Sequence, residues 1–128
     1  MNNLVSYPIA KDTPVSHLPF SPAVRVGDLI FVSGQASVDA TGKIVADTFE
    51  GEFRRSVENL RKVLETAGSD LKHVIQTRNY VRDAANVPRY NELYREYFSA
   101  PFPTRTTITN CLPPTLHYEI ECVAVAKA

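Results

Sequence analysis

The sequence predicts a single α+β domain, spanning residues 1–128, in which two helices cover one face of a β-sheet. Three observations lead to this fold class. Apolar β-prone runs lie near both ends of the chain, two segments with helical spacing lie between them, and another β-prone run separates those two segments. The resulting order is ββαβαββ. A length of 128 residues, 44% hydrophobic and 22% charged, suits one globular domain with its own core.

The first part of the chain is predicted to be irregular and then to form a β-hairpin. Four prolines interrupt residues 1–22, which are expected to lack regular structure. Residues 23–34 predict two strands joined by a turn at Gly27-Asp28. Residues 29–32 are apolar on both faces, so we expect that strand to be covered on both sides. A second turn is expected at residues 40–43.

An amphipathic helix is predicted next. Asp47 or Thr48 can cap its N-terminus, and the helix is expected to end before Gly68. Apolar residues recur at four-three-four-three spacing and predict one buried stripe, consisting of Phe53, Val57, Leu60, Leu64 and Ala67.

The second half of the chain predicts a strand, a helix and two closing strands. Residues 71–81 form the strand, and Asn86 is expected to cap the helix, with Pro88 in its first turn. A Pro-Phe-Pro segment ends the helix, and strands follow at about residues 105–111 and 117–126. The helix residues expected to point inward are Tyr90, Leu93, Tyr94, Tyr97 and Phe98.

The two helices can cover only one face of the sheet. Residues 29–32 and 122–126 are nevertheless apolar on both faces. Burial of apolar surface contributes about 25 cal/mol per Å², so such strands favour a covered face over an exposed one. The sequence therefore predicts self-association through the open face.

Composition and charge narrow the classes of function. The formal net charge is zero, from 14 basic and 14 acidic residues, which disfavours a nucleic-acid-binding surface. No apolar run approaches the roughly 20 residues of a membrane span. Cys111 and Cys122 lack CxxC spacing and no secretory segment opens the chain, so a cytoplasmic location is expected. The three histidines lack ligand spacing, and no metal site is expected.

The last quarter of the chain carries the candidate chemistry. Arg105 opens a β-prone run that has no other charge, and Glu119 and Glu121 lie on the following strand. A guanidinium on one strand and a carboxylate on the next could bind a small carboxylate beside a general base. From the residues alone, the alternative is a structural ion pair between Arg105 and either glutamate.

Seven short motifs occur in order between about Leu18 and Ala126. They are Pro19-x-Ser21, Val32-Ser-Gly-Gln35, Asn59 ahead of Leu64-x-x-Ala67-Gly68, Tyr90-Asn91-x-x-Tyr94, Pro103-Thr-Arg105, Leu112-Pro113 and Glu119-Ile-Glu121. With these motifs the chain resembles the Rid family of enamine/imine deaminases, also called YjgF or L-PSP proteins.

The resemblance implies a chorismate-mutase-like fold, with one mixed sheet and two helices on one face. It also implies a homotrimer whose three sheets form a central barrel, with active sites in the clefts between subunits. Members of the family hydrolyse 2-aminoacrylate and its imine tautomer 2-iminopropionate to a 2-keto acid and ammonia. They need no metal or organic cofactor.

The resemblance further implies roles for individual residues. Arg105 matches the position that binds the substrate carboxylate, for which a planar guanidinium fork is suited. Glu119 matches the position that orients or deprotonates water, or passes a proton to the leaving nitrogen. Backbone groups near Thr107 and Ile108 are expected to hold the imine nitrogen. The matching pocket-lining positions are Ser33 and Asn91. A turn role for the serine and local capping by the asparagine are the alternatives.

Three departures from the family pattern bear on the substrate. Phe20 stands where deaminating members usually carry tyrosine, and Thr107 stands where a cysteine is frequent. Six residues separate Arg105 from Leu112 instead of seven, which predicts a register shift unless a bulge absorbs it. Phe20 and the Pro-Thr-Arg-Thr-Thr segment resemble the 2-aminomuconate deaminase branch, so a bulkier or more apolar substrate is expected to fit.

Two other classes of function remain open from the sequence. One is a regulatory member of the family that binds keto acids without turnover. The other is an RNA-cleaving translation inhibitor, an activity also attached to this family. The second would need a basic groove, which the zero net charge disfavours.

Overall fold

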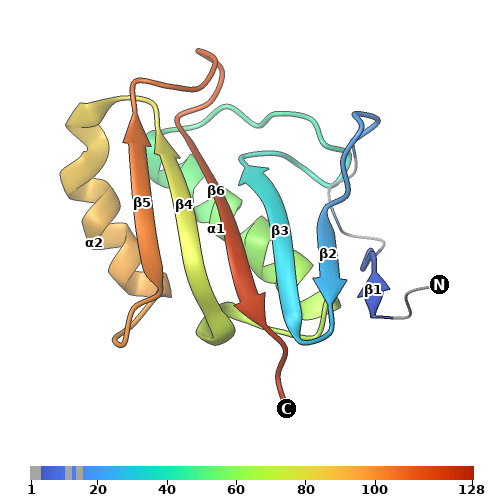
Figure 1. Cartoon of the computed structure of the whole chain (residues 1–128). Helices are drawn as coiled ribbons and strands as arrows, with labels where there is room; N and C mark the ends of the chain where they lie inside the picture. The colour runs from blue at the N-terminus through green and yellow to red at the C-terminus, as the bar shows by residue number, and fades with distance from the viewer. Residues whose placement is uncertain (1–3, 11–12, 14–15) are drawn as a thin grey trace.

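The computed structural model describes residues 4–10, 13 and 16–128. In these residues six strands form one mixed sheet in the order β1-β2-β3-β6-β4-β5 (Figure 1). Every neighbouring pair is antiparallel except β4 and β5, which are parallel. The strands are β1 (Val5–Ser6), β2 (Ala23–Val26), β3 (Leu29–Ala36), β4 (Val74–Val81), β5 (Thr104–Thr109) and β6 (Tyr118–Val125).

Two helices, α1 (Phe49–Thr66) and α2 (Val87–Tyr97), lie behind the sheet in the view of Figure 1. On β3, Ile30 and Val32 are buried in the core beneath the helices, whereas Leu29 and Phe31 are 41% and 45% exposed on the other face. This alternation follows from the period of two along a strand. The predicted α+β class with both helices on one face is confirmed, and apolar side chains do line the open face.

The first helix forms as its sequence predicts. The side chain of Thr48 accepts a hydrogen bond from the backbone N–H of Gly51 and caps the N-terminus. The helix ends at Thr66, ahead of Gly68, whose φ of +90° is the left-handed conformation common after helices. All five residues of the predicted stripe belong to the buried core.

Two predicted boundaries and one predicted cap are wrong for local reasons. Within the segment expected to be irregular, β1 pairs with β2. Residues 71–73 form a 3₁₀ turn rather than strand, because the Asp70 side chain accepts from the backbone N–H of His73 and caps that turn. Asn86 precedes α2 but makes no capping bond with its side chain. It closes another 3₁₀ turn with helical φ and ψ, whereas capping geometry needs an extended residue. Tyr97 is only partly buried.

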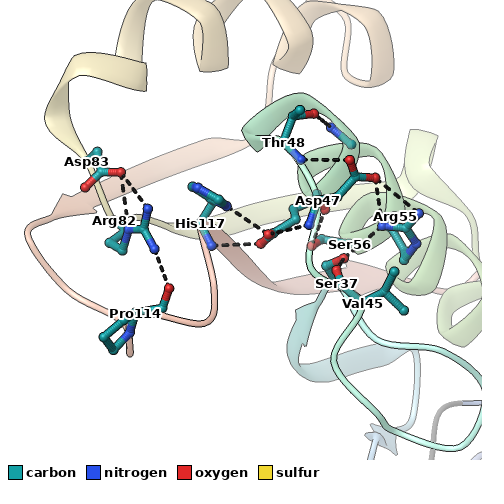
Figure 2. A network of polar contacts seen from close by, with 12 residues as sticks. Ser37, Val45, Asp47, Thr48, Arg55, Ser56, Arg82, Asp83, Pro114 and His117 are labelled. Carbon is teal, nitrogen blue, oxygen red and sulfur yellow. Dashed lines mark hydrogen bonds and ion pairs between the residues drawn. The ribbon is translucent and has the colours of Figure 1, made fainter.

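A buried carboxylate ties α1 to the segment that enters β6. Glu52 is 1% exposed, and its Oε1 accepts from the backbone N–H of His117 at 2.8 Å. Its Oε2 lies 2.8 Å from His117 Nδ1 and 3.2 Å from the backbone nitrogen of Asp47. Figure 2 shows His117 and Asp47 within this network. Because β6 begins at Tyr118, this contact fixes the start of the strand that carries Glu119.

Replacing Glu52 by glutamine is expected to lower the free energy of unfolding by about 2–3 kcal/mol. Three donors converge on the two carboxylate oxygens, and an amide group would turn one of its own donors toward them. Denaturant unfolding at fixed protein concentration measures the effect. Glu58→Gln, on the same helix but in an exposed pair with Arg61, is the matched control and should cost less than about 1 kcal/mol. Equal losses for the two variants would contradict the structural role of Glu52.

Candidate active site

Arg105 lies on the face of the sheet that α2 covers. It pairs in register with Thr77 of β4, and its guanidinium carbon lies 4.8 Å and 5.0 Å from the ring centroids of Tyr90 and Tyr94. A cation over two aromatic faces is held by the ring quadrupoles. Among the described residues no carboxylate forms an ion pair with Arg105, so the structural ion pair with Glu119 or Glu121 is not what this chain forms.

A buried polar network supports Tyr94 beneath the guanidinium. The Tyr94 hydroxyl lies 2.8 Å from Thr77 Oγ1, which accepts from Asn79 Nδ2 at 3.0 Å. The Tyr118 hydroxyl in turn donates to Asn79 Oδ1 at 2.5 Å. Thr77, Asn79 and Tyr118 are fully buried. Since these polar groups are paired with one another, the platform under Arg105 is fixed in one arrangement.

Thr107 faces the same side as Arg105. Its hydroxyl lies 2.9 Å from the Tyr90 hydroxyl, and burial raises the pKa of Tyr90 to about 12. The next residue, Ile108, points to the open face and is 43% exposed. In this chain β5 is an edge strand, so backbone groups on its outer side are available to a ligand or to another chain. The prediction that these groups hold an imine nitrogen stays a prediction.

A cavity of about 250 Å³ opens beside Arg105. It is lined by Asn91, Tyr94, Arg95, Phe102, Pro103 and Arg105. The side-chain oxygen of Asn91 is buried and has no hydrogen-bond partner in the described part of the chain. Buried polar atoms normally have a partner, so this oxygen is an exception among the described residues. Local capping by the Asn91 side chain, the alternative from the sequence, is therefore wrong.

Glu119 lies on the opposite face of the sheet. Its neighbours Tyr118 and Ile120 are fully buried in the helix-covered core, so the alternation along β6 turns Glu119 to the open face. No described residue donates a hydrogen bond to it, whereas Glu121 accepts one from the Tyr80 hydroxyl. Burial, and secondarily the charge of Glu121, raise the pKa of Glu119 above its ordinary value. These features favour Glu119 over Glu121 as a base.

The backbone of β3 is bulged where it passes Glu119. The β3–β6 register shifts between Val32 and Gln35, so the Ser33-Gly34 pair forms a β-bulge inside the strand rather than the turn considered as the alternative for Ser33. At Gly34 an added Cβ would lie 2.0 Å from Oε2 of Glu119. The glycine thus makes room for the carboxylate.

The bulge is also tied to the segment that carries Phe20. Ser33 Oγ donates to the carbonyl oxygen of Ser21 at 2.6 Å, and the Ser33 backbone N–H donates to that of Pro22 at 2.9 Å. Phe20, next to Ser21, is 52% exposed. Phe20 therefore lies near the Ser33 side of the sheet and does not line the cavity beside Arg105.

The predicted site residues fall into two groups. We call Asn91 on α2 together with Arg105 and Thr107 on β5 the arginine half-site. Ser33 and Gly34 at the bulge of β3, together with Glu119 on β6, are the glutamate half-site. A single chain does not bring Arg105 and Glu119 together, because they lie on opposite faces of one sheet. Whether the two side chains serve one site stays a prediction, and such a site needs more than one copy of the chain.

The shortened segment between Arg105 and Leu112 consists of regular strand and a sharp turn. The parallel β4–β5 pairing runs unbroken from Thr104 to Thr109. The chain turns sharply after the strand, where Asn110 and Leu112 have φ of 58° and 75°. No bulge interrupts β5, and the predicted change of register relative to the family stays a prediction.

Sequence reasoning missed Arg95 and Phe102 as cavity residues. Asn91 and Arg95 are four residues apart on α2, a spacing that places both on one helix face, so helical periodicity could have found Arg95. Phe102 lies in the loop between α2 and β5, where periodicity gives no signal.

Over the described residues, no three His, Cys, Asp or Glu side chains gather in a way that could hold a metal ion. In the same part of the chain, neither helix is both long and apolar enough to span a bilayer.

The protein is a small α+β domain, in which both helices cover one face of a mixed sheet. It carries a candidate anion site, with one half-site on each face of that sheet. The chain belongs to the family described as Endoribonuclease L-PSP, whose model matches residues 10–126. This confirms the predicted L-PSP, or Rid, membership.

Individual relatives agree with this assignment. A RutC family protein of Pyrococcus abyssi is 36% identical over 108 residues, covering 83% of this chain and 85% of the relative. The human protein named 2-iminobutanoate/2-iminopropanoate deaminase is 33% identical over 109 residues, covering 84% of this chain and 80% of the human protein. The structure of Escherichia coli TdcF with bound serine superposes with a TM-score of 0.84 at 29% identity, covering 95% of this chain and 99% of TdcF.

Proposed function

We propose that the protein hydrolyses small enamine and imine acids of the 2-aminoacrylate/2-iminopropionate type to a 2-keto acid and ammonia. The observation that carries this proposal is the Arg105 guanidinium, which lies over two tyrosines at a cavity with no carboxylate partner. Such a cation suits a substrate carboxylate. Relatives named 2-iminobutanoate/2-iminopropanoate deaminase, from human and from Dermatophagoides farinae, support the choice of reaction.

In the proposed reaction, the enamine first takes a proton at its terminal carbon and becomes the imine. Arg105 holds the carboxylate through two parallel hydrogen bonds. Water then adds to the imine carbon while Glu119 takes one of its protons. Glu119 passes that proton to the nitrogen, which gives the neutral carbinolamine. A second proton then moves from the carbinolamine hydroxyl through the same carboxylate to the nitrogen, the C–N bond breaks, and ammonia leaves as the C=O bond forms. The balance is one imine and one water to one keto acid and one ammonia.

Asn91 and the edge of β5 are proposed to orient the substrate nitrogen. The unpaired Asn91 oxygen can accept a hydrogen bond from the imine or enamine N–H. Backbone groups near Thr107 and Ile108 supply the remaining contacts. Orientation of a small charged substrate by a fixed carboxylate clamp contributes several kcal/mol to the rate enhancement. The family resemblance implies that no cofactor takes part.

The two half-sites are proposed to meet between subunits. Within one chain the sheet separates Arg105 from Glu119, so one substrate can contact both only where two copies join. The exposed apolar side chains of the open face, including Leu29 and Phe31, support packing against another copy. We infer a closed homotrimer with three such clefts, and the number three rests on the family resemblance.

RNA cleavage, the activity carried in the family model's name, is less well supported. All the helix arginines except Arg95 are paired with neighbouring carboxylates. Examples are the pairs of Arg54 with Glu50 and Glu96, and of Arg89 with Glu50 and Glu92. Together with a net charge of zero, this disfavours a groove that binds phosphates.

The proposed activity is tested by generating 2-aminoacrylate from serine with a dehydratase in the presence of semicarbazide. The protein should reduce the amount of trapped semicarbazone by converting the imine to pyruvate first. Saturable keto-acid binding without acceleration of imine decay would instead identify a regulatory protein. Binding to RNA that weakens steeply with salt would favour the nuclease.

Gly34→Ala is expected to lower kcat/KM for the imine about 100-fold. The new methyl group cannot coexist with Oε2 of Glu119 at 2.0 Å, so the carboxylate must move by about an ångström or more. The measurement is a double-mutant cycle with Glu119→Gln. In the glutamine background the same change should cost less than about threefold, because the reacting carboxylate is already gone. An equal cost in both backgrounds would contradict the positioning role of Gly34.

A further inference from the structure

We propose that the cavity beside Arg105 selects imine or enamine acids with a second carboxylate, and that Arg95 binds this second group. The inference rests on the proposed function, since it assigns the first carboxylate to Arg105. Both arginines line the same cavity, one from α2 and one from β5, and no acidic residue lines it. Two cations without an anion between them fit a dianionic ligand.

The lack of carboxylate partners is unusual among the arginines of this chain. All nine arginines lie in the described residues, and six of them have a carboxylate within 4.0 Å: Arg25, Arg54, Arg55, Arg61, Arg82 and Arg89. The other three are Arg78, Arg95 and Arg105. Two of these three meet at one cavity.

Local sequence does not explain why Arg95 lacks a partner. Glu92, at i−3, and Glu96, at i+1, are the nearest carboxylates along α2. Glu92 instead pairs with Arg89 at 3.3 Å, and Glu96 pairs with Arg54 at 3.0 Å. The guanidinium of Arg95 contacts only the backbone carbonyl of Asn91, at 3.3 Å, within the described structure. The positive charge of Arg95 is therefore available to an anionic ligand.

The cavity also has the size and walls for a longer substrate. Its volume of about 250 Å³ leaves room for more than a three-carbon imino acid. Tyr94, Phe102 and Pro103 form apolar walls beside the two guanidiniums. The body of the substrate between its carboxylates is thus expected to be an apolar or unsaturated carbon chain.

The test compares two imines of equal chain length that differ in the second carboxylate. Amino-acid oxidases, with catalase present, generate 2-iminoglutarate from glutamate and 2-iminopentanoate from norvaline. We expect the wild type to favour the dicarboxylate in kcat/KM. In Arg95→Gln the ratio of the two values should fall about 10- to 100-fold, the size of one charge-assisted hydrogen bond. Added salt should lower the wild-type ratio, because exposed charges are screened.

Arg89→Gln is the matched control, an exposed arginine on the same helix that lies outside the cavity and should keep the wild-type ratio. An Arg95→Gln ratio within twofold of wild type would overturn the inference. If the wild type hydrolyses neither imine, the proposed reaction is contradicted. The role of Arg95 is then tested separately, by the binding of the corresponding 2-oxo acids. Calorimetry should then show a preference for 2-oxoglutarate over 2-oxopentanoate that Arg95→Gln loses, and equal affinities would overturn it.

Discussion

Arg105→Ala is expected to lower kcat/KM for 2-aminoacrylate hydrolysis by about three orders of magnitude. The variant loses a bidentate, charge-assisted contact and, with it, the orientation of the imine carbon toward water, together worth about 4 kcal/mol. Arg105→Lys keeps the charge without the planar fork and should lose about 10- to 100-fold. The semicarbazide competition assay measures all three proteins.

The fold should survive the loss of Arg105. The side chain is exposed and makes no ion pair with a described residue, and its contacts are the faces of Tyr90 and Tyr94. The free energy of unfolding, measured by thermal denaturation, should therefore change by no more than about 1 kcal/mol. Arg89→Ala removes a guanidinium from the neighbouring helix surface and should retain activity within about twofold. Full activity in Arg105→Ala would contradict the carboxylate clamp.

Glu119→Gln is expected to lower kcat/KM about 100- to 1,000-fold, the usual contribution of a general base. Glutamine keeps the shape of the side chain but cannot take a proton from water. The same assignment fixes a pH dependence. Only ionised Glu119 is active, so kcat/KM should fall as pH drops through the pKa of this group, which lies above the ordinary value of 4.5.

Glu121→Gln provides the matched test of that pH dependence. Glu121 raises the pKa of Glu119 because the two negative charges repel each other. Its removal should move the acid limb of the kcat/KM profile to lower pH. Glutamine at this position can still accept the hydrogen bond from Tyr80. A limb that stays in place, or moves to higher pH, would show that another group controls the profile.

Helical periodicity predicted α1 well because all five residues of its stripe serve one purpose, burial against the sheet. The capping of α2 was less predictable. Asn86 has a typical capping side chain, but it closes a 3₁₀ turn with helical φ and ψ, and its side chain makes no capping hydrogen bond. Residue type alone does not contain that conformation.

The separation of Arg105 from Glu119 could not be predicted from their sequence. The spacing between them crosses a loop with two left-handed residues, Asn110 and Leu112, so strand periodicity cannot be carried from β5 to β6. Their faces follow only from the strand order, in which β4 lies between the two strands and pairs in parallel with β5. The family motifs give these residues as candidates, and the tertiary structure places Arg105 and Glu119 on opposite faces of the sheet.

The most direct measurement of the composite site is complementation between Arg105→Ala and Glu119→Gln. The two variants carry different affinity tags, are refolded together, and mixed oligomers are isolated by sequential capture. In a closed trimer whose clefts take Arg105 from one subunit and Glu119 from the next, each mixed trimer has one intact cleft of three. We predict that the mixed trimers have about one third of the wild-type activity, although each parent variant alone is nearly inactive. Mixed oligomers no more active than the parents would contradict a site shared between subunits.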